Sequence, residues 1–497
     1  MKNLLFIGVD QLRWDCLGPC KAVPVKTPNL DRLIENGVSF DRAYCTSPLC
    51  TPSRASMLTG DYAFTHGMGT NCDMYHALAR ELTRPERLLH NDLRRAGYRC
   101  GFVGKWHVGV EKGPGDYGFE GDAPAGYGNI VKTKAFQDYL SSTGLSYSIE
   151  PELYFNPDQQ TMAAGRWRGP QASTPCHFLT DQIIGMLQGL AGGSAPFFAT
   201  VQYWDPHGPH LISDEFYGVT DRTKITPWNN FSDDLSGKPR RVKRERDDFY
   251  RNHPRTEEEL VAYIGYYCDH VAMLDCEIGR LLDYVDQSGL AENTLVVFTS
   301  DHGDMTGAHG GLIDKGLPYS EAMRVPLIFS HPSLQSGRRD ALALNMDILP
   351  TALSLLGVSY APRQAEDLSA QVLGTSQQGR DYLLAEYHGL RFLYSQRILV
   401  SRDNFKYIFS PGDMDELYDL DSDPGEMRNL AAEADYADVL SRMRSALIDE
   451  TARYLDPLRD CVAKFNGQWR THSGQFDVTS AYLTEAAPRG GQRTCPD

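Results

Sequence analysis

Short apolar runs recur along the first two thirds of the chain, and three of the four main runs end in acidic or histidine side chains. The runs are residues 3–10 (NLLFIGVD), 196–210 (PFFATVQYWDPHGPH), 293–305 (NTLVVFTSDHGDM) and 324–332 (RVPLIFSHP). Runs that are apolar on both faces suit a mainly parallel sheet covered on both sides. The pattern therefore predicts an α/β fold, with a large, mainly parallel central sheet sandwiched by helices.

Amphipathic segments separate these runs. In residues 27–37 (TPNLDRLIENG), Thr27 is placed to cap a helix, Pro28 suits its first turn and Gly37 ends it. Residues 256–287 predict a long helix, because the opening TEEEL puts acidic side chains where the helix dipole favours them. The charged segment 240–248 (RRVKRERDD) is interpreted as a solvated surface insertion.

The pattern changes after about residue 380. Short, partly alternating segments such as DYLLAEYHG, FLYSQRILVS and FKYIFSP predict strands joined by turns, and a helix is expected near 430–454. A chain of 497 residues also suits more than one domain. We predict a catalytic α/β domain at 1–378 and a smaller C-terminal α+β subdomain with an antiparallel sheet and a tail at 379–497. The boundary falls in the polar segment GTSQQGR (374–380).

Composition narrows the range of partners. Asp and Glu number 65 against 49 Lys and Arg, for a formal net charge of −16, which disfavours nucleic acid and anionic membrane surfaces. No apolar run approaches the length of a membrane helix. The start, MKNLLFIGVDQLR, is interpreted as a buried strand and not as an export signal, because no small-residue cleavage site follows it. We therefore expect a cytoplasmic protein.

The eleven cysteines show no compact zinc-type spacing, and in a reducing compartment most are expected to be free, buried thiols. Cys50 needs a separate account, because it lies in the unusual stretch SPLCTPSRASMLTG (47–60).

Polar side chains cluster directly after the apolar runs. Asp10, Gln11, His207, Asp301 and His302 all occupy such positions. In an open α/β sheet, the active site lies beyond the carboxyl ends of the strands, so these side chains are expected to meet at one edge.

The stretch around Cys50 resembles the signature of the type I sulfatases, members of the alkaline phosphatase superfamily. Their C-x-P-S-R pattern is matched by Cys50, Pro52, Ser53 and Arg54. Four further segments are similar to the family in the family's order: 104–109 (GKWHVG), 205–210 (DPHGPH), 300–328 and 416–430 (ELYDLDSDPGEMRNL). The resemblance covers nearly the whole chain and implies an alkaline-phosphatase-like fold and hydrolysis of a sulfate monoester.

In that family a separate maturation enzyme oxidises the signature cysteine to the aldehyde Cα-formylglycine. The resemblance therefore implies that Cys50 is a precursor of the nucleophile. A hydrated aldehyde carries two hydroxyls on one carbon: one attacks sulfur, and the other later loses its proton so that sulfate is expelled and the aldehyde returns. A serine carries only one hydroxyl and could not release the sulfate in this way.

The resemblance also implies one divalent metal, held by Asp10, Gln11, Asp301 and His302 together with residue 50. Carboxylate and amide oxygens suit Ca²⁺, which is the metal we expect. The Gln11 and His302 combination also occurs in related phosphonate monoester hydrolases and leaves Mn²⁺ open.

The remaining roles follow from the same resemblance. Arg54 and Lys105 would stabilise the deprotonated hydrate, and Lys315 would bind sulfate oxygens. His107 would take the proton during sulfate release, and His207 would protonate the departing alcohol. His210 is an alternative acid or a substrate contact. His309 is left open between a structural or rim role and a functional role in substrate binding.

Three functions remain in competition. The first is a sulfatase acting on a small-molecule sulfate ester, with choline, aryl and sugar sulfates all open. The second is a phosphonate monoester or phosphodiester hydrolase, which the Lys105 and His107 pair of GKWH disfavours. The third is a non-catalytic anion-binding protein with an unmodified Cys50. Homo-oligomerisation is left open.

Overall fold

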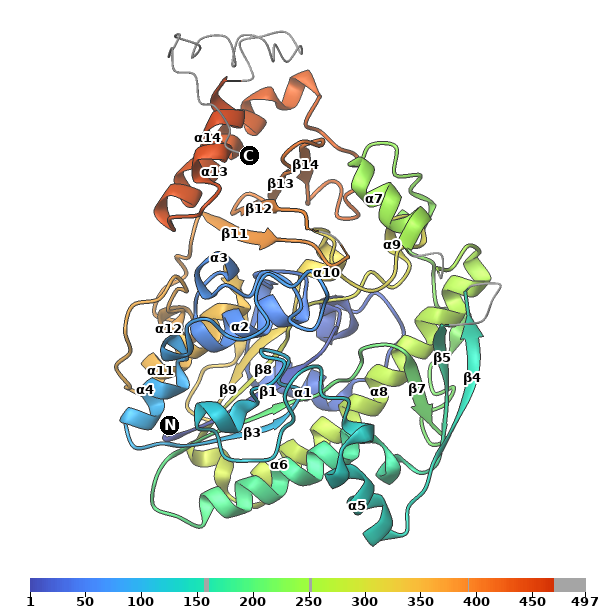
Figure 1. Cartoon of the computed structure of the whole chain (residues 1–497), viewed down its shortest axis with the longest axis vertical. Coiled ribbons are helices and arrows are strands. Elements are labelled where there is room, and N and C mark those ends of the chain that lie inside the picture. The colour runs from blue at the N-terminus through green and yellow to red at the C-terminus, as the bar shows by residue number, and fades with distance from the viewer. Residues whose placement is uncertain (156–160, 250–252, 392, 469–497) are drawn as a thin grey trace, which may run out of the picture. The chain divides into compact units, whose positions relative to one another are not determined.

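The structure is a computed structural model that describes residues 1–155, 161–249, 253–391 and 393–468 (Figure 1). The chain divides into two compact units, Met1–Met443 and Arg444–Asp497. In the second unit the structure describes the end of α13 (Ala437–Arg453) and α14 (Arg459–Gln468). Most of the tail after residue 456, including everything beyond 468, lies outside the described residues.

A seven-stranded sheet forms the centre of the first unit. Its strand order is β10-β2-β9-β8-β1-β6-β3, and β9 alone of these strands runs antiparallel to its neighbours. This confirms the predicted large, mainly parallel sheet. The strands are β1 (Asn3–Val9), β2 (Val38–Tyr44), β3 (Arg99–Gly104), β6 (Phe197–Gln202), β8 (Thr294–Ser300), β9 (Leu327–Ser330) and β10 (Gly337–Leu344).

Helices cover both faces of this sheet, as the two-sided apolar runs require. α1 (Pro28–Asn36), α6 (Pro175–Ala191) and α8 (Glu257–Gln287) contribute to one continuous apolar core with β1, β6 and β8. Figure 1 shows α2 (Cys50–Thr59) and α11 (Ile348–Leu355) on the other side of the strands. Shorter helices are α3 (Ala63–His66), α4 (His90–Arg95), α5 (Lys134–Thr143), α7 (Arg240–Arg244), α9 (Ala308–Gly311), α10 (Ser320–Met323) and α12 (Ser369–Val372).

The two helices predicted between the apolar runs, α1 and α8, are present with nearly the predicted bounds. In α8 the Thr256 side chain accepts a hydrogen bond from the backbone N–H of Glu259, as an N-cap should. In α1 Thr27 occupies the N-cap position, but its hydroxyl donates to Asp31 Oδ1 at 3.0 Å instead of capping the backbone. The competing carboxylate in the first turn explains that difference.

A second, four-stranded sheet confirms the predicted antiparallel arrangement. It contains β11 (Tyr382–Tyr387), β12 (Gln396–Ser401), β13 (Phe405–Phe409) and β14 (Glu416–Asp419) in sequence order. It belongs to the same compact unit as the parallel sheet. The hydroxyl of Tyr319, the residue before α10, donates to Glu416 of β14 at 2.9 Å. This buried hydrogen bond links the antiparallel sheet to the segment between β8 and β9. The boundary at 378/379 itself stays a prediction.

Two features of the middle of the chain differ from the sequence interpretation. β4 (Ser148–Tyr154), β5 (Met162–Arg168) and β7 (His210–Ser213) form a third sheet that was not predicted. Arg241, in the segment interpreted as solvated, is buried with its guanidinium 4.5 Å from the ring centroid of Tyr394. Cation–π contact with that ring offsets the cost of burying the charge.

No helix in the described ranges is both long enough and apolar enough to cross a membrane.

His66 makes the stability of the fold depend on pH. Its Nδ1 accepts the N–H of Met68 at 3.1 Å and its Nε2 lies 3.1 Å from Ser56 Oγ, so the buried ring is neutral. Burial lowers its pKa to about 4. Since the unfolded chain binds the proton near pH 6.5, the free energy of unfolding should fall by about 3 kcal/mol through this residue between pH 6.5 and 4.

Urea denaturation of the wild type and of His66→Gln at several pH values checks this prediction. We expect the stability difference between the two proteins to shrink by about 3 kcal/mol as the pH falls from 6.5 to 4. A difference that stays constant over this range would show that His66 does not couple folding to protonation.

Candidate active site

The predicted polar residues meet at the carboxyl edge of the parallel sheet. Asp10 and Gln11 follow β1, Asp301 and His302 follow β8, and Lys105 follows β3. These strands, with β6 between β1 and β3, are consecutive in the sheet order. The edge rule for α/β sheets therefore places the residues correctly.

Cys50 is the first residue of α2, and its side chain is buried among these groups. Its Sγ lies 3.3 Å from His302 Nε2, 3.9 Å from Asp10 Oδ1 and 3.9 Å from Lys105 Nζ. The Sγ atom stands where the hydroxyl oxygens of a formylglycine hydrate would lie. Burial and Asp10 oppose ionisation of the thiol, but Lys105, Lys315 and His302 outweigh them and lower its pKa to about 5. The position thus favours a negatively charged atom.

Four side chains form a compact, buried donor set. Ligand atoms of Asp10, Cys50, Asp301 and His302 all lie within 4.8 Å of one another. His302 Nδ1 lies 2.8 Å from the carbonyl of Gly303 and donates to it, which directs Nε2 toward position 50 and the carboxylates of the set. Two carboxylates, one imidazole nitrogen and the atom at position 50 fit a divalent cation.

Arg54 and Lys105 donate hydrogen bonds to the carboxylates of this donor set. Arg54 Nε donates to Asp301 Oδ2 at 2.8 Å and Nη2 donates to Asp10 Oδ2 at 3.3 Å. Lys105 donates to the same Asp10 oxygen. Burial opposes the charge on Asp10, but Lys105 and further cations hold its pKa well below the ordinary value. Gln202, which the sequence reasoning missed, accepts from Arg54 Nη1 at 3.2 Å.

Gln11 and His207 converge on Lys315. The Lys315 ammonium donates to Gln11 Oε1 at 2.9 Å and to His207 Nε2 at 2.6 Å. The amide nitrogen of Gln11 donates to Asp314 at 3.2 Å and also to Asp304. In the described structure the Gln11 side chain therefore orients Lys315, and its role as a metal ligand stays a prediction.

The proton shared by His207 and Lys315 resides on the lysine. His207 Nδ1 lies 2.7 Å from the carbonyl of Gly208, to which it donates, so Nε2 is the accepting nitrogen. Burial and the Lys315 charge lower the pKa of His207 to about 3. In the structure His207 therefore accepts a hydrogen bond from Lys315 and carries no proton on Nε2.

His107 faces two residues that sequence reasoning missed. Its Nε2 lies 3.1 Å from Asp73 Oδ1, and its ring meets the ring of Tyr127 edge-on at 5.3 Å. Lys105 Nζ lies 4.4 Å from the same Tyr127 ring centroid. Asp73 and Tyr127 come from loops with no periodic pattern, so nothing in the sequence signals their position.

His210 and His309 lie in networks of their own. His210 Nδ1 lies 3.3 Å from His270 Nδ1, and the ring packs against Tyr263 and Tyr267. His309 Nδ1 pairs with Asp233 at 3.0 Å. Both histidines are buried, and within the described residues neither contacts Cys50 or Asp301. The geometry favours structural roles, and substrate binding by either stays a prediction.

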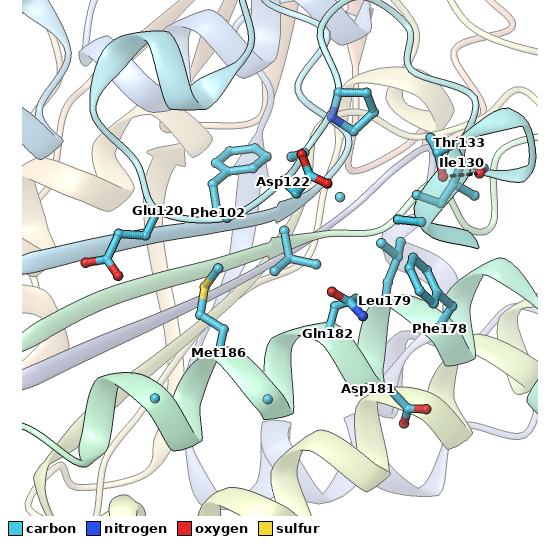
Figure 2. Close-up of a pocket in the computed structure, with 18 of the residues that line it drawn as sticks. Phe102, Glu120, Asp122, Ile130, Thr133, Phe178, Leu179, Asp181, Gln182 and Met186 are labelled. Carbon is cyan, nitrogen blue, oxygen red and sulfur yellow. Dashed lines mark hydrogen bonds between the residues drawn. The ribbon is translucent and has the colours of Figure 1, made fainter. Parts of the chain in front are cut away.

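A separate pocket of about 390 Å³ opens between β3, residues 120–124 and α6 (Figure 2). Apolar side chains such as Phe102, Phe178 and Met186 line it, with Glu120 and Asp122 at its edges. None of the predicted site residues lines this pocket. The candidate active site is therefore the buried cluster around Cys50.

The fold and this cluster suit a hydrolase that acts on an anionic ester: a buried thiol at position 50, a donor set that fits a divalent cation, and the cationic side chains of Arg54, Lys105 and Lys315. The family model described as Sulfatase matches residues 2–358, and the model for the C-terminal part of N-sulphoglucosamine sulphohydrolase matches residues 307–453. The chain belongs to the sulfatase family, and it is a sulfuric ester hydrolase.

Two relatives and one solved structure show what the chain is similar to. The chain is 29% identical over 512 residues to YidJ, an uncharacterised sulfatase of Escherichia coli (strain K12), covering 98% of this chain and 93% of that protein. It is 26% identical to a choline-sulfatase of Rhizobium meliloti, covering 86% and 82%. The solved phosphonate monoester hydrolase of Silicibacter pomeroyi superposes with a TM-score of 0.76 at 23% identity, covering 92% and 96%. The alkaline-phosphatase-like fold is thereby confirmed.

Proposed function

We propose that the protein hydrolyses a small-molecule sulfate monoester to an alcohol and inorganic sulfate, with a formylglycine hydrate at position 50 as nucleophile. The observation that carries the proposal is the place of Cys50. It begins α2 inside the C-x-P-S-R stretch, within 4 Å of Asp10, Lys105 and His302. The N-terminus of a ten-residue helix favours negative charge there.

A divalent cation, Ca²⁺ first and Mn²⁺ as the alternative, would be held by Asp10, Asp301, His302 and residue 50, with Gln11 as a further predicted ligand. When bound, such a cation acidifies a hydroxyl group and polarises a sulfate oxygen. The chain supplies the rest of the positive charge through Arg54 and Lys105, which already point at this donor set. Fixed cations in a buried site stabilise developing negative charge without reorganisation.

Lys315 and His207 serve the leaving group in this proposal. Lys315 would contact sulfate oxygens and the bridging oxygen. Because its ammonium holds the proton that His207 accepts, the pair can deliver that proton to the departing alcohol.

The burial of Cys50 bears on its maturation. Cys50 is 1% exposed and every residue of α2 is buried, so an enzyme cannot reach the thiol in the folded protein. We propose that the maturation enzyme acts on the chain before this helix packs. A cytoplasmic location and self-association remain proposals from the sequence.

The alternative function is hydrolysis of phosphonate monoesters or phosphodiesters. The Gln11 and His302 pair and the similar fold of a phosphonate monoester hydrolase support it. Lys105 and His107, which lie in the site around position 50, favour the sulfatase, because the phosphonate hydrolases that the chain resembles lack this pair.

An assay of matured protein tests the proposal. We expect kcat/KM for at least one ester among choline, aryl and sugar sulfates to exceed that for a phosphonate monoester by about 100-fold or more, which is roughly 3 kcal/mol in transition-state binding. Peptide mass spectrometry should show Cys50 oxidised in the active protein. Faster phosphonate hydrolysis would favour the alternative, and an unmodified thiol with no turnover would reject the enzymatic mechanism.

A further inference from the structure

Asp73 holds the imidazole of His107 from the loop between α3 and α4. Asp73 Oδ1 lies 3.1 Å from His107 Nε2, while the His107 carbonyl accepts the Thr51 hydroxyl at 2.7 Å. The backbone of His107 is thus bound to the residue after Cys50, and its side chain is bound to Asp73. His107 is 1% exposed and the Asp73 side chain 39% exposed, so the pair joins the buried site to its rim.

The pairing decides which nitrogen of His107 is basic. A carboxylate only accepts hydrogen bonds, so Nε2 must carry the proton that it donates to Asp73. The hydrogen bond from His107, ahead of the opposing effect of burial, keeps the pKa of Asp73 below its ordinary value and so keeps the carboxylate charged. Nδ1 is then left with a lone pair.

Nδ1 of His107 is buried and has no hydrogen-bond partner in the described part of the chain. A buried polar atom without a partner costs about 1–3 kcal/mol, so its missing partner calls for an explanation. The edge-on Tyr127 ring closes one side of the imidazole. In the proposed reaction that partner would be a hydroxyl of the hydrated residue 50, since the His107 carbonyl is already bound to the next residue, Thr51.

We propose that Asp73 is a positioning residue that fixes the Nε2–H tautomer of His107, so that Nδ1 takes the proton that triggers sulfate release. This inference rests on the proposed function. The second hydroxyl loses its proton to Nδ1, and its electron pair forms the C=O bond of the aldehyde. The carbon–oxygen bond to sulfate breaks, and its electron pair leaves with the sulfate.

A metal centre at the same place is a weaker interpretation. Cys72, Asp73 and His107 also lie within 4.8 Å of one another. Burial, against the opposing Thr51 hydrogen bond, raises the pKa of Cys72 to about 11, so the thiol stays protonated and is a poor ligand. The Cys72 Sγ instead lies 3.7 Å from the His107 carbonyl and donates to it.

Steady-state and burst kinetics of Asp73→Asn test the role. Sulfate release follows alcohol release, so slowing it should lower kcat by about 10- to 100-fold and lower KM by a similar factor, with kcat/KM nearly unchanged. A burst of alcohol should precede the slow phase. As a control, Asp122→Asn removes an exposed carboxylate from another loop and should leave kcat and KM unchanged. A fall in kcat/KM without a burst would overturn the role in release.

Histidine-selective ¹⁵N NMR of the full chain gives a readout that needs no turnover. The His107 resonance, assigned by its absence in His107→Gln, should show the Nε2–H tautomer in the wild type and a mixture of tautomers in Asp73→Ala. An Nδ1–H tautomer in the wild type, or no change in Asp73→Ala, would overturn the pairing. If no ester is hydrolysed, the proposed function fails while this spectrum still tests the pairing itself.

Discussion

Replacing Cys50 with alanine is expected to lower sulfatase activity by at least about 10⁴-fold, because alanine offers no atom that can attack sulfur. The surrounding charges would stay paired, since Arg54 and Lys105 both donate to Asp10. The variant should therefore still fold. Activity is measured as inorganic sulfate released from the best ester of the panel, and folding by thermal denaturation.

A Cys50→Ser variant sharpens this test. One hydroxyl can attack sulfur, but no second hydroxyl can expel the sulfate, so a single turnover followed by arrest is expected. Intact-protein mass spectrometry should then find one sulfo group on the chain. Cys100→Ala, which removes another buried thiol in β3, serves as the matched control and should keep its activity. Full activity in Cys50→Ala would reject the mechanism while leaving the fold untouched.

The meeting of the site residues was predictable because it depends on two local patterns and one rule of architecture. Apolar runs identify β1 and β8, and the polar residues directly after each run, such as Asp10 and Asp301, must then lie at the same sheet edge. The register of these strands pairs Val9 with Ser300, so the residues that follow are neighbours. No long-range information was needed for this part.

The surroundings of these residues could not be predicted in the same way. Asp73 and Tyr127 reach His107 from loops, and loop geometry is set by tertiary packing with no periodic signal in the sequence. Arg241 illustrates the same limit. A run of charged residues predicts a solvated surface, but the rings of Tyr387 and Tyr394, from a distant segment, cover the Arg241 guanidinium. The direction of the hydrogen bond from Lys315 to His207 could not be predicted either, because it depends on the contact between two residues that are 108 positions apart.

Loss of one carboxylate from the donor set gives the second large expected effect. Asp301 binds Arg54 at 2.8 Å and accepts the backbone N–H groups of Gln11 and His302 at 3.2 and 2.9 Å. Asp301→Asn keeps the size of the side chain but removes one negative charge and one of the two accepting oxygens from the cluster. We expect metal content after dialysis to fall at least tenfold and activity to fall by about 10³-fold, because a hard cation depends on ligand charge.

Metal analysis beside the activity assay separates binding from chemistry. Asp340→Asn is the matched control. It removes a carboxylate whose side chain is 83% exposed, and it should retain metal and activity. Chelation of the wild type should give the same loss, and restoring Ca²⁺ or Mn²⁺ separately shows which ion the site uses. Because His302 provides one nitrogen beside two carboxylates, recovery with Mn²⁺ alone would show that the imidazole outweighs the oxygen ligands in selecting the ion. Full activity in chelated, metal-free protein would contradict the role of the donor set, since Arg54 and Lys105 alone would then neutralise the sulfate.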